Sequence, residues 1–180
     1  MGQRKLSWAS LMGVSVFLVA MNVVTVGAAK QTQAPAADSA ATLDVKGAVR
    51  QELRLSAADL KALARVKVTA KDHDGTAHEY EGVALQTLLA KAGVPMGGEL
   101  RGKNMTLVVV AEATDGYKAV FSLAEMDEDF AHEQVIVADA ADGKPLDAQH
   151  GPLRLVVPGD KRQGRWVRLL KAITVQKAGE

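Results

Sequence analysis

Short stretches of alternating apolar and polar residues recur along the chain, and this pattern predicts mainly β-strands. Leu43–Leu55 alternates loosely around Gly47, which predicts two short strands joined by a turn. Five further stretches are rich in Val, Ile, Leu and Ala, and we predict a strand in each: 106–111, 117–121, 135–138, 153–157 and 167–175. The last two are apolar enough to lie centrally in a sheet.

Two short helices interrupt these strands. Ser56 followed by Asp59 resembles a capping box, in which the serine hydroxyl and the acidic side chain satisfy free backbone N–H groups at a helix start. The apolar positions of 85–92 follow helical spacing, Gly93 suits the position after the last turn, and Pro95 prevents continuation. We therefore predict a compact α+β domain with a mixed sheet and short peripheral helices.

Asp74-Gly75 is a strong turn signal and predicts a β-hairpin over 66–80. A two-residue turn there places His73 opposite Thr76. It also places Lys71 opposite His78. That register puts five polar residues on one face of the hairpin, which is either a solvated surface or one wall of a site: Thr69, Lys71, His73, His78 and Tyr80.

The N-terminus has the pattern of a secretory signal peptide. Arg4 and Lys5 precede an uncharged apolar run over 11–26, and small residues follow through Ala29. We predict a signal peptide over 1–29, a flexible leader over 30–41 and one domain over 42–180. An uncleaved membrane anchor is the alternative, but the run is short for a membrane span.

We expect the mature protein to be periplasmic or secreted, with no membrane insertion after cleavage. Removal of Arg4 and Lys5 leaves 20 basic residues against 21 acidic ones, a net charge near −1. A near-neutral chain gives no reason to expect nucleic acid or anionic lipid as a partner. The signal lacks a twin arginine, so general export of an unfolded chain is expected, and any cofactor is then acquired outside the cytoplasm.

The sequence contains no cysteine, which excludes disulfides and thiolate metal ligands. It also has no nucleophile elbow and no phosphate-binding glycine motif. His73 and His78 form at most a weak candidate zinc pair, because their spacing matches no zinc pattern. His132 and His150 look isolated.

The stretch 150–167 is the most informative part of the chain. It contains an apolar strand that ends at a Pro158-Gly159 turn, followed by a group of cations and Trp166. Polar and aromatic residues displayed after a rigid strand end suit a flat or anionic ligand. Candidate site residues with this character, from turns in both halves of the domain, are His73, Asp115, Tyr117, Arg162 and Trp166.

The C-terminal half, read as one piece, resembles the oxidoreductase molybdopterin-binding domain of the sulfite oxidase family. The segments that carry this resemblance are Asp-Gly-Tyr-Lys-Ala-Val-Phe-Ser-Leu-Ala-Glu-Met (115–126), Val-Ile-Val-Ala-Asp (135–139), Asp-Gly-Lys-Pro-Leu (142–146), His-Gly-Pro-Leu-Arg-Leu-Val-Val-Pro-Gly (150–159) and Trp-Val (166–167). Tyr-x-Gly-Val-x-Leu-x-x-Leu-Leu at 80–89 is similar to the helix entry of the same family. The resemblance implies a sulfite oxidase-like fold, places Arg154 in a family signature, and puts Lys161, Arg162 and Trp166 on the pterin side.

This chain departs from the family at one functional position. Enzymes of the family hold molybdenum through one cysteine thiolate, in a loop that corresponds here to 71–75. With no cysteine, the direct bond from protein to metal is lost. The resemblance to small secreted members without the cysteine therefore implies a non-catalytic binder of molybdopterin or a free reduced pterin, without molybdenum.

Such a binder is expected to act as a ligand sensor or carrier. A pterin would stack on Trp166 or Tyr117 and pair its amino edge with Asp115. A sensor also requires a protein to report to, such as a membrane receptor or signalling protein. Two alternatives stay open: a molybdopterin-dependent oxidoreductase or accessory redox protein with a non-cysteine ligand such as His73, and a structural domain that has lost its ligand.

Overall fold

The structure, a computed structural model, describes residues 42–132 and 134–179. The predicted signal peptide and leader lie outside these residues. Within them, no helix is long and apolar enough to cross a membrane.

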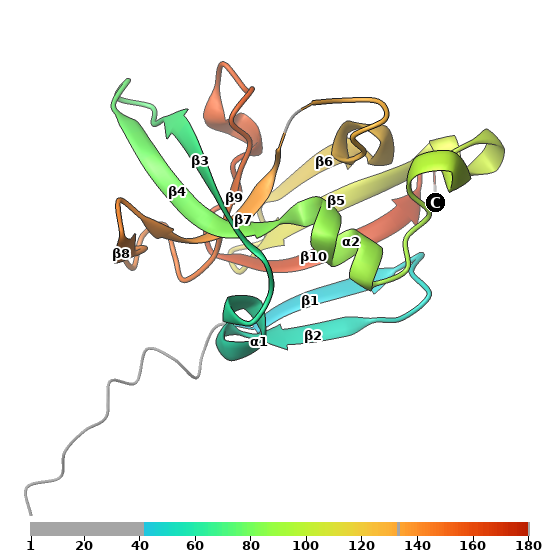
Figure 1. Cartoon of the computed structure of the whole chain (residues 1–180), viewed down its shortest axis with the longest axis horizontal. Helices are drawn as coiled ribbons and strands as arrows, with labels where there is room; N and C mark the ends of the chain where they lie inside the picture. Colours follow the sequence, from blue (N-terminus) through green and yellow to red (C-terminus); the bar gives the residue numbers. More distant parts are fainter. Residues whose placement is uncertain (1–41, 133, 180) are drawn as a thin grey trace, which may run out of the picture. The chain divides into compact units, whose positions relative to one another are not determined.

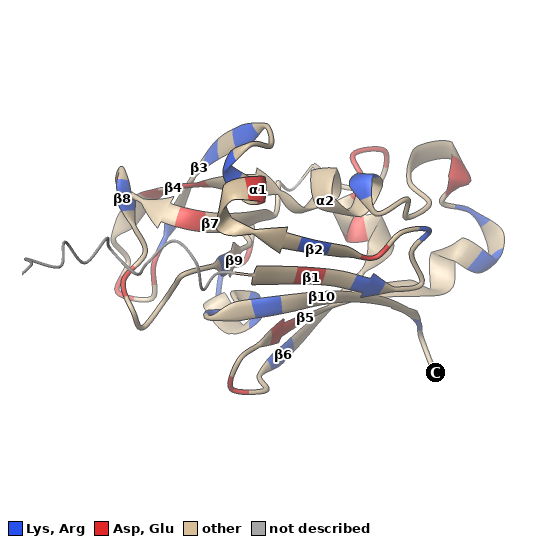
Figure 2. Ribbon diagram, turned by 90° about the horizontal axis from the view of Figure 1, so that it is seen from below, with Lys and Arg blue, Asp and Glu red and all other residues tan. Residues whose placement is uncertain are grey.

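The first sheet contains five strands in the order β2-β1-β10-β5-β6, which lie side by side in Figure 2. β1 runs parallel to β10, and the other neighbouring pairs are antiparallel, so the sheet is mixed. The first and last strands of the domain are therefore joined by hydrogen bonds. The strands are β1 (Thr42–Gly47), β2 (Leu53–Ser56), β5 (Leu107–Ala113), β6 (Lys118–Ser122) and β10 (Leu170–Lys177).

The second sheet is antiparallel and has the order β3-β4-β7-β8, with β9 also pairing with β7 (Figure 1). Gly82 is required where β4 meets β7, because a Cβ there would lie 2.0 Å from the Val137 carbonyl oxygen. The strands are β3 (Arg65–Lys71), β4 (Ala77–Ala84), β7 (Ile136–Ala141), β8 (Lys144–Pro145) and β9 (Arg154–Val156).

Both predicted helices form. In α1 (Ala57–Lys61), the Ser56 hydroxyl accepts the Asp59 N–H while Asp59 accepts the Ser56 N–H, which is the predicted capping box. α2 (Leu85–Lys91) ends before Gly93, whose φ of +72° suits the residue after a helix. Four 3₁₀ turns complete the described residues: η1 (Gly97–Glu99), η2 (Gly102–Thr106), η3 (Leu123–Met126) and η4 (Gln163–Arg165).

One continuous hydrophobic core holds these elements together. It draws Val45 and Ile173 from the first sheet, Val83 and Leu155 from the second, and Leu88 from α2, all fully buried. Burial of this kind contributes roughly 1.5–3 kcal/mol per large aliphatic side chain. The predicted α+β class with a mixed sheet and short peripheral helices is confirmed.

The predicted register of the first hairpin is wrong by one residue. Ala70, not Lys71, lies opposite His78, and Val68 lies opposite Tyr80. The turn has three residues between Asp72 and Thr76, because Asp72 N–H donates to the Thr76 carbonyl. Since side chains alternate between the faces of a strand, this shift separates the five polar residues that were grouped on one face.

His78 and Tyr80 therefore share a face with Ala70 and Val68, and Tyr80 is buried in the core. Thr69 and Lys71 project from the opposite face and are exposed. The expected single polar face does not exist.

Candidate ligand-binding site

A buried guanidinium lies at the centre of the site. Arg154, on β9, is only 4% exposed. Its Nη1 donates to Asp72 Oδ2 at 3.3 Å and to the Tyr80 hydroxyl at 3.2 Å, and its Nη2 donates to Gln163 Oε1 at 3.3 Å. Its buried Nε has no hydrogen-bond partner within residues 42–132 and 134–179. This donor is a polar group that the described residues leave unsatisfied.

Asp72 supplies the countercharge. Burial alone would raise the pKa of the Asp72 carboxyl, but hydrogen bonds from the His73 N–H and from Arg154 outweigh this and hold the pKa well below its usual range. Burial raises the pKa of the neighbouring Tyr80 hydroxyl to about 12. At neutral pH the cluster is therefore an ionised Asp72–Arg154 pair beside a protonated tyrosine.

Two aromatic rings enclose the guanidinium. The Arg154 carbon Cζ lies 5.0 Å from the ring centroid of Trp166 and 5.6 Å from that of Tyr80, within the range of cation–π attraction. The two rings meet edge to face at 5.7 Å. Trp166 also donates its indole N–H to the Val157 carbonyl at 2.9 Å and is 4% exposed. Trp166 thus positions Arg154 and keeps little free surface for a ligand.

A cavity of about 410 Å³ opens beside this cluster. Its wall combines the end of the first hairpin, the turn between β5 and β6, and the loop that leads into β10. It is lined by Asp72, His73, Ala113, Asp115, Tyr117, His150, Arg154, Gln163, Trp166 and Arg168. This volume lies in the usual range for small-molecule sites.

The β5–β6 turn contributes a carboxylate and an aromatic ring. Asp115 Oδ1 accepts the Tyr117 N–H at 2.9 Å, which fixes the turn. The Tyr117 hydroxyl donates to the Gly164 carbonyl, yet 51% of the residue remains exposed. Tyr117 therefore offers more stacking area than Trp166 does.

The structure brings together five of the seven predicted site residues in this cavity: His73, Asp115, Tyr117, Arg154 and Trp166. Lys161 and Arg162 do not line it. They line an adjacent hollow of about 800 Å³, which shares Asp72, His73 and Gln163 with the cavity. Pro158 and Gly159 line this adjacent hollow together with the two cations.

Comparison with known protein families matches residues 31–180 to the family described as "Oxidoreductase molybdopterin binding domain". The chain belongs to this family. A similar solved structure is the sulfane dehydrogenase SoxCD from Paracoccus pantotrophus, with a TM-score of 0.61 and 23% sequence identity. The match covers 77% of this chain but only 39% of the SoxCD chain. Comparison with curated proteins gave no match. The predicted family and its sulfite oxidase-like fold are confirmed.

The donors of this molybdopterin-binding domain suit the pterin part of such a cofactor. The orphan Nε of Arg154, the Asp115 carboxylate and the Tyr117 ring supply a donor, an acceptor and a stacking surface. A ligand for the metal is lacking in two respects. The sequence has no cysteine, and the described residues contain no group of three His, Asp or Glu placed to hold a metal ion. The residues therefore suit the pterin part of the cofactor, and the thiolate that holds the metal in the resemblance has no counterpart in this sequence.

Sequence reasoning missed four residues of this molybdopterin-binding domain: Asp72, Tyr80, Gln163 and Arg168. Asp72 and Tyr80 are the partners of Arg154, and Gln163 also donates to the Lys71 carbonyl at 2.8 Å. Asp72 lay in the loop that the resemblance compares with the thiolate loop, so its position was a usable signal. Tyr80 was among the polar residues predicted on one hairpin face and begins a segment of the resemblance, whereas no local pattern pointed to Gln163 or Arg168.

His150 was predicted to be isolated, yet it lines the cavity. Its ring Nδ1 lies 2.8 Å from Asp147 Oδ2, so it also stabilises the loop before β9. His73 is held beside Asp72, with Nδ1 at 3.2 Å from Oδ1, and its side chain is largely exposed. His73 thus lies at the mouth of the cavity.

Proposed function

We propose that this protein is an exported pterin-binding protein that uses the molybdopterin-binding fold for recognition and not for catalysis. The observation that carries the proposal is the cavity beside Arg154 in a family member without any cysteine. Asp115 is placed to accept N–H groups from the amino edge of a pterin. The exposed ring of Tyr117 provides the stacking surface.

The buried ion pair supports a binding role. Asp72 lies in the loop that the family resemblance compares with the thiolate loop, and it is already committed to Arg154. A carboxylate used in this way is neutralised by its partner and has little capacity left for a metal. The loop therefore contributes to the structure of the pocket, and the pterin is retained by hydrogen bonds and stacking alone.

The proposal is tested on protein purified from its exported form. Mass spectrometry identifies the ligand released on denaturation, and elemental analysis measures molybdenum in the same sample. We expect a pterin and far less than one molybdenum per chain. Stoichiometric molybdenum would overturn the metal-free assignment. Absence of any bound pterin, together with no binding of added tetrahydropterin at micromolar concentration, would overturn the binding role.

The second candidate is a molybdopterin-dependent oxidoreductase with His73 in place of the thiolate. It is favoured by the family itself and by the position of His73 at the cavity mouth. His73→Ala should then abolish metal retention. Under the first proposal, the same substitution leaves the metal content unchanged at a low level.

A further inference from the structure

Arg168 is a cation at the cavity that the family resemblance did not indicate. It is exposed and lines the cavity together with Asp115 and Tyr117. No hydrogen bond or ion pair joins its side chain to another residue in the part of the chain that the structure describes. Its five N–H donors are therefore available to a ligand.

The backbone on both sides of Arg168 is fixed. The Val167 carbonyl accepts the Leu155 N–H at 2.8 Å, which ties the segment to β9. The Leu169 carbonyl accepts the Thr114 N–H at 3.0 Å, which ties it to the end of β5. Arg168 therefore extends from a rigid bridge between the two sheets.

Leu169 adopts an unfavourable conformation that maintains this bridge. Its φ is +51°, a left-handed value that a branched side chain rarely takes. Such strain persists only where surrounding contacts impose it, and it is frequent at ligand sites. Here the strained residue directly follows the cation that lines the cavity.

Some charged side chains at the cavity form an ion pair and others do not. Asp72 and Arg154 neutralise each other at the base. Asp115 and Arg168 line the same cavity, and within the described ranges neither forms an ion pair. Among the described residues, the cavity thus offers one carboxylate and one guanidinium outside any ion pair, which matches a ligand with a donor edge at one end and an anionic group at the other.

We propose that Arg168 is a specificity-determining residue that binds an anionic substituent of the ligand, a carboxylate or a phosphate. This inference rests on the proposed pterin-binding function and adds the ligand class, an anionic pterin. Asp115 accepts from the amino edge of the ring, and the Arg168 guanidinium binds the anion in bidentate fashion.

The test compares two pterins that share the ring and differ in the charge of one substituent. Reduced 6-carboxypterin and 6-hydroxymethylpterin are titrated anaerobically into the wild-type protein and into Arg168→Gln. We expect the wild type to favour the carboxylate by about tenfold. Arg168→Gln should lose this preference, with unchanged affinity for the hydroxymethyl compound. Arg168→Lys should retain part of it, because an ammonium keeps the charge and loses the bidentate geometry.

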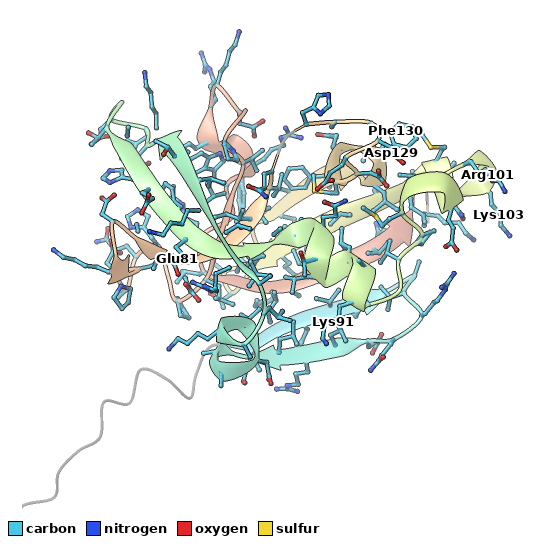
Figure 3. All side chains as sticks on the ribbon, in the orientation of Figure 1. Glu81, Lys91, Arg101, Lys103, Asp129 and Phe130 are labelled. Carbon is cyan, nitrogen blue, oxygen red and sulfur yellow. The ribbon has the colours of Figure 1, made fainter. Side chains whose placement is uncertain are left out.

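Arg101→Gln is the matched control. Arg101 is an exposed arginine between η1 and η2, labelled in Figure 3, and it does not line the cavity. Equal loss of preference in Arg101→Gln would show a general charge effect and overturn the proposal. Equal weakening of both pterins by Arg168→Gln would also overturn it.

The titrations distinguish a failure of the proposed role of Arg168 from a failure of the proposed pterin-binding function. A wild-type protein that binds both pterins with equal affinity overturns the role of Arg168 and leaves pterin binding intact. A wild-type protein that binds neither pterin overturns both. Thermal melting of each variant checks folding, and an exposed residue such as Arg168 should leave the melting temperature unchanged.

Discussion

Two hairpin turns with the same local geometry lie at the cavity, and only one of them is expected to bind the ligand. Residues 72–76 and 113–117 both form three-residue loops. The first residue of each donates its N–H to the carbonyl of the last, at 2.8 Å and 2.9 Å. Gly75 and Gly116 have φ values of +85° and +88°. The two backbones are almost identical.

The aspartates in these turns also match. Asp74 Oδ1 accepts the Thr76 N–H at 2.8 Å, and Asp115 Oδ1 accepts the Tyr117 N–H at 2.9 Å. Asp115 lines the cavity and Asp74 does not. The difference lies in what surrounds each turn, since the β5–β6 turn is packed beside the loop that leads into β10. Local backbone geometry forms each turn, and tertiary packing places Asp115 at the cavity.

The first residue of each turn shows the largest difference. It is Asp72 in one turn and Ala113 in the other, and only Asp72 holds a buried cation. Asp72→Ala should lower the free energy of unfolding by about 3 kcal/mol, because Arg154 is left buried without its countercharge. Urea denaturation measures this loss. Asp74→Ala, which removes an exposed turn carboxylate, should cost much less, and equal losses would contradict the role of the pair.

Ligand affinity should separate the two turn aspartates. Asp115→Asn should weaken pterin binding about tenfold, because a neutral amide replaces a carboxylate that accepts N–H groups. Asp74→Asn keeps the same backbone contact in the other turn and should leave affinity unchanged. Isothermal titration of both variants decides the matter. An equal effect of the two substitutions would place the ligand elsewhere.

The two turn glycines should behave alike. Gly75→Ala and Gly116→Ala should each cost about 1 kcal/mol, because alanine is strained at positive φ. A Cβ at either position meets no atom within 4 Å, so no clash adds to the strain. Denaturation curves of the two variants should therefore agree. A clearly larger loss at one position would show that the turns differ in backbone strain.

The smallest expected effect is a pH dependence from the contact between the first hairpin and the turn that joins β7 to β8. His78 Nδ1 lies 2.6 Å from Asp142 Oδ2, and this hydrogen bond raises the pKa of His78 above its ordinary value of 6.5. The stabilisation of the folded protein by charged His78 is therefore complete below pH 6.5. It is lost as the pH rises through the higher pKa that His78 has in the folded protein. The same hydrogen bond lowers the pKa of Asp142 below its ordinary value of 3.8. The Asp142 carboxylate therefore contributes its full stabilisation of the folded protein above pH 3.8 and loses it as the pH falls through the lower folded pKa.

His78→Gln tests this dependence. The stability difference between wild type and variant should be largest between these two ordinary pKa values and should shrink as the pH rises above 6.5. Thermal melts across this range measure the difference. Tyr117→Phe, a change in the other hairpin, should show no such trend. A difference that is constant with pH would contradict the assignment.

Much of the fold was predictable because its signals are local. The capping box of Ser56 and Asp59, the helix stop at Gly93 and the β-branched strands depend on neighbours a few residues apart. The register of the first hairpin was not predictable in the same way. Asp-Gly suits both a two-residue and a three-residue loop, and the burial of Tyr80 decided between them.

The sequence by itself determined the family, the strand and helix pattern, and the absence of a thiolate, since each follows from residue identity and short-range spacing. Only the tertiary structure decided which charges are free. Arg154 and Asp72 are 82 residues apart and neutralise each other, whereas Asp115 and Arg168 form no ion pair at the cavity within the described part of the chain. The physical reason is that ion pairing depends on distances of a few ångströms in space, which packing between the two sheets sets.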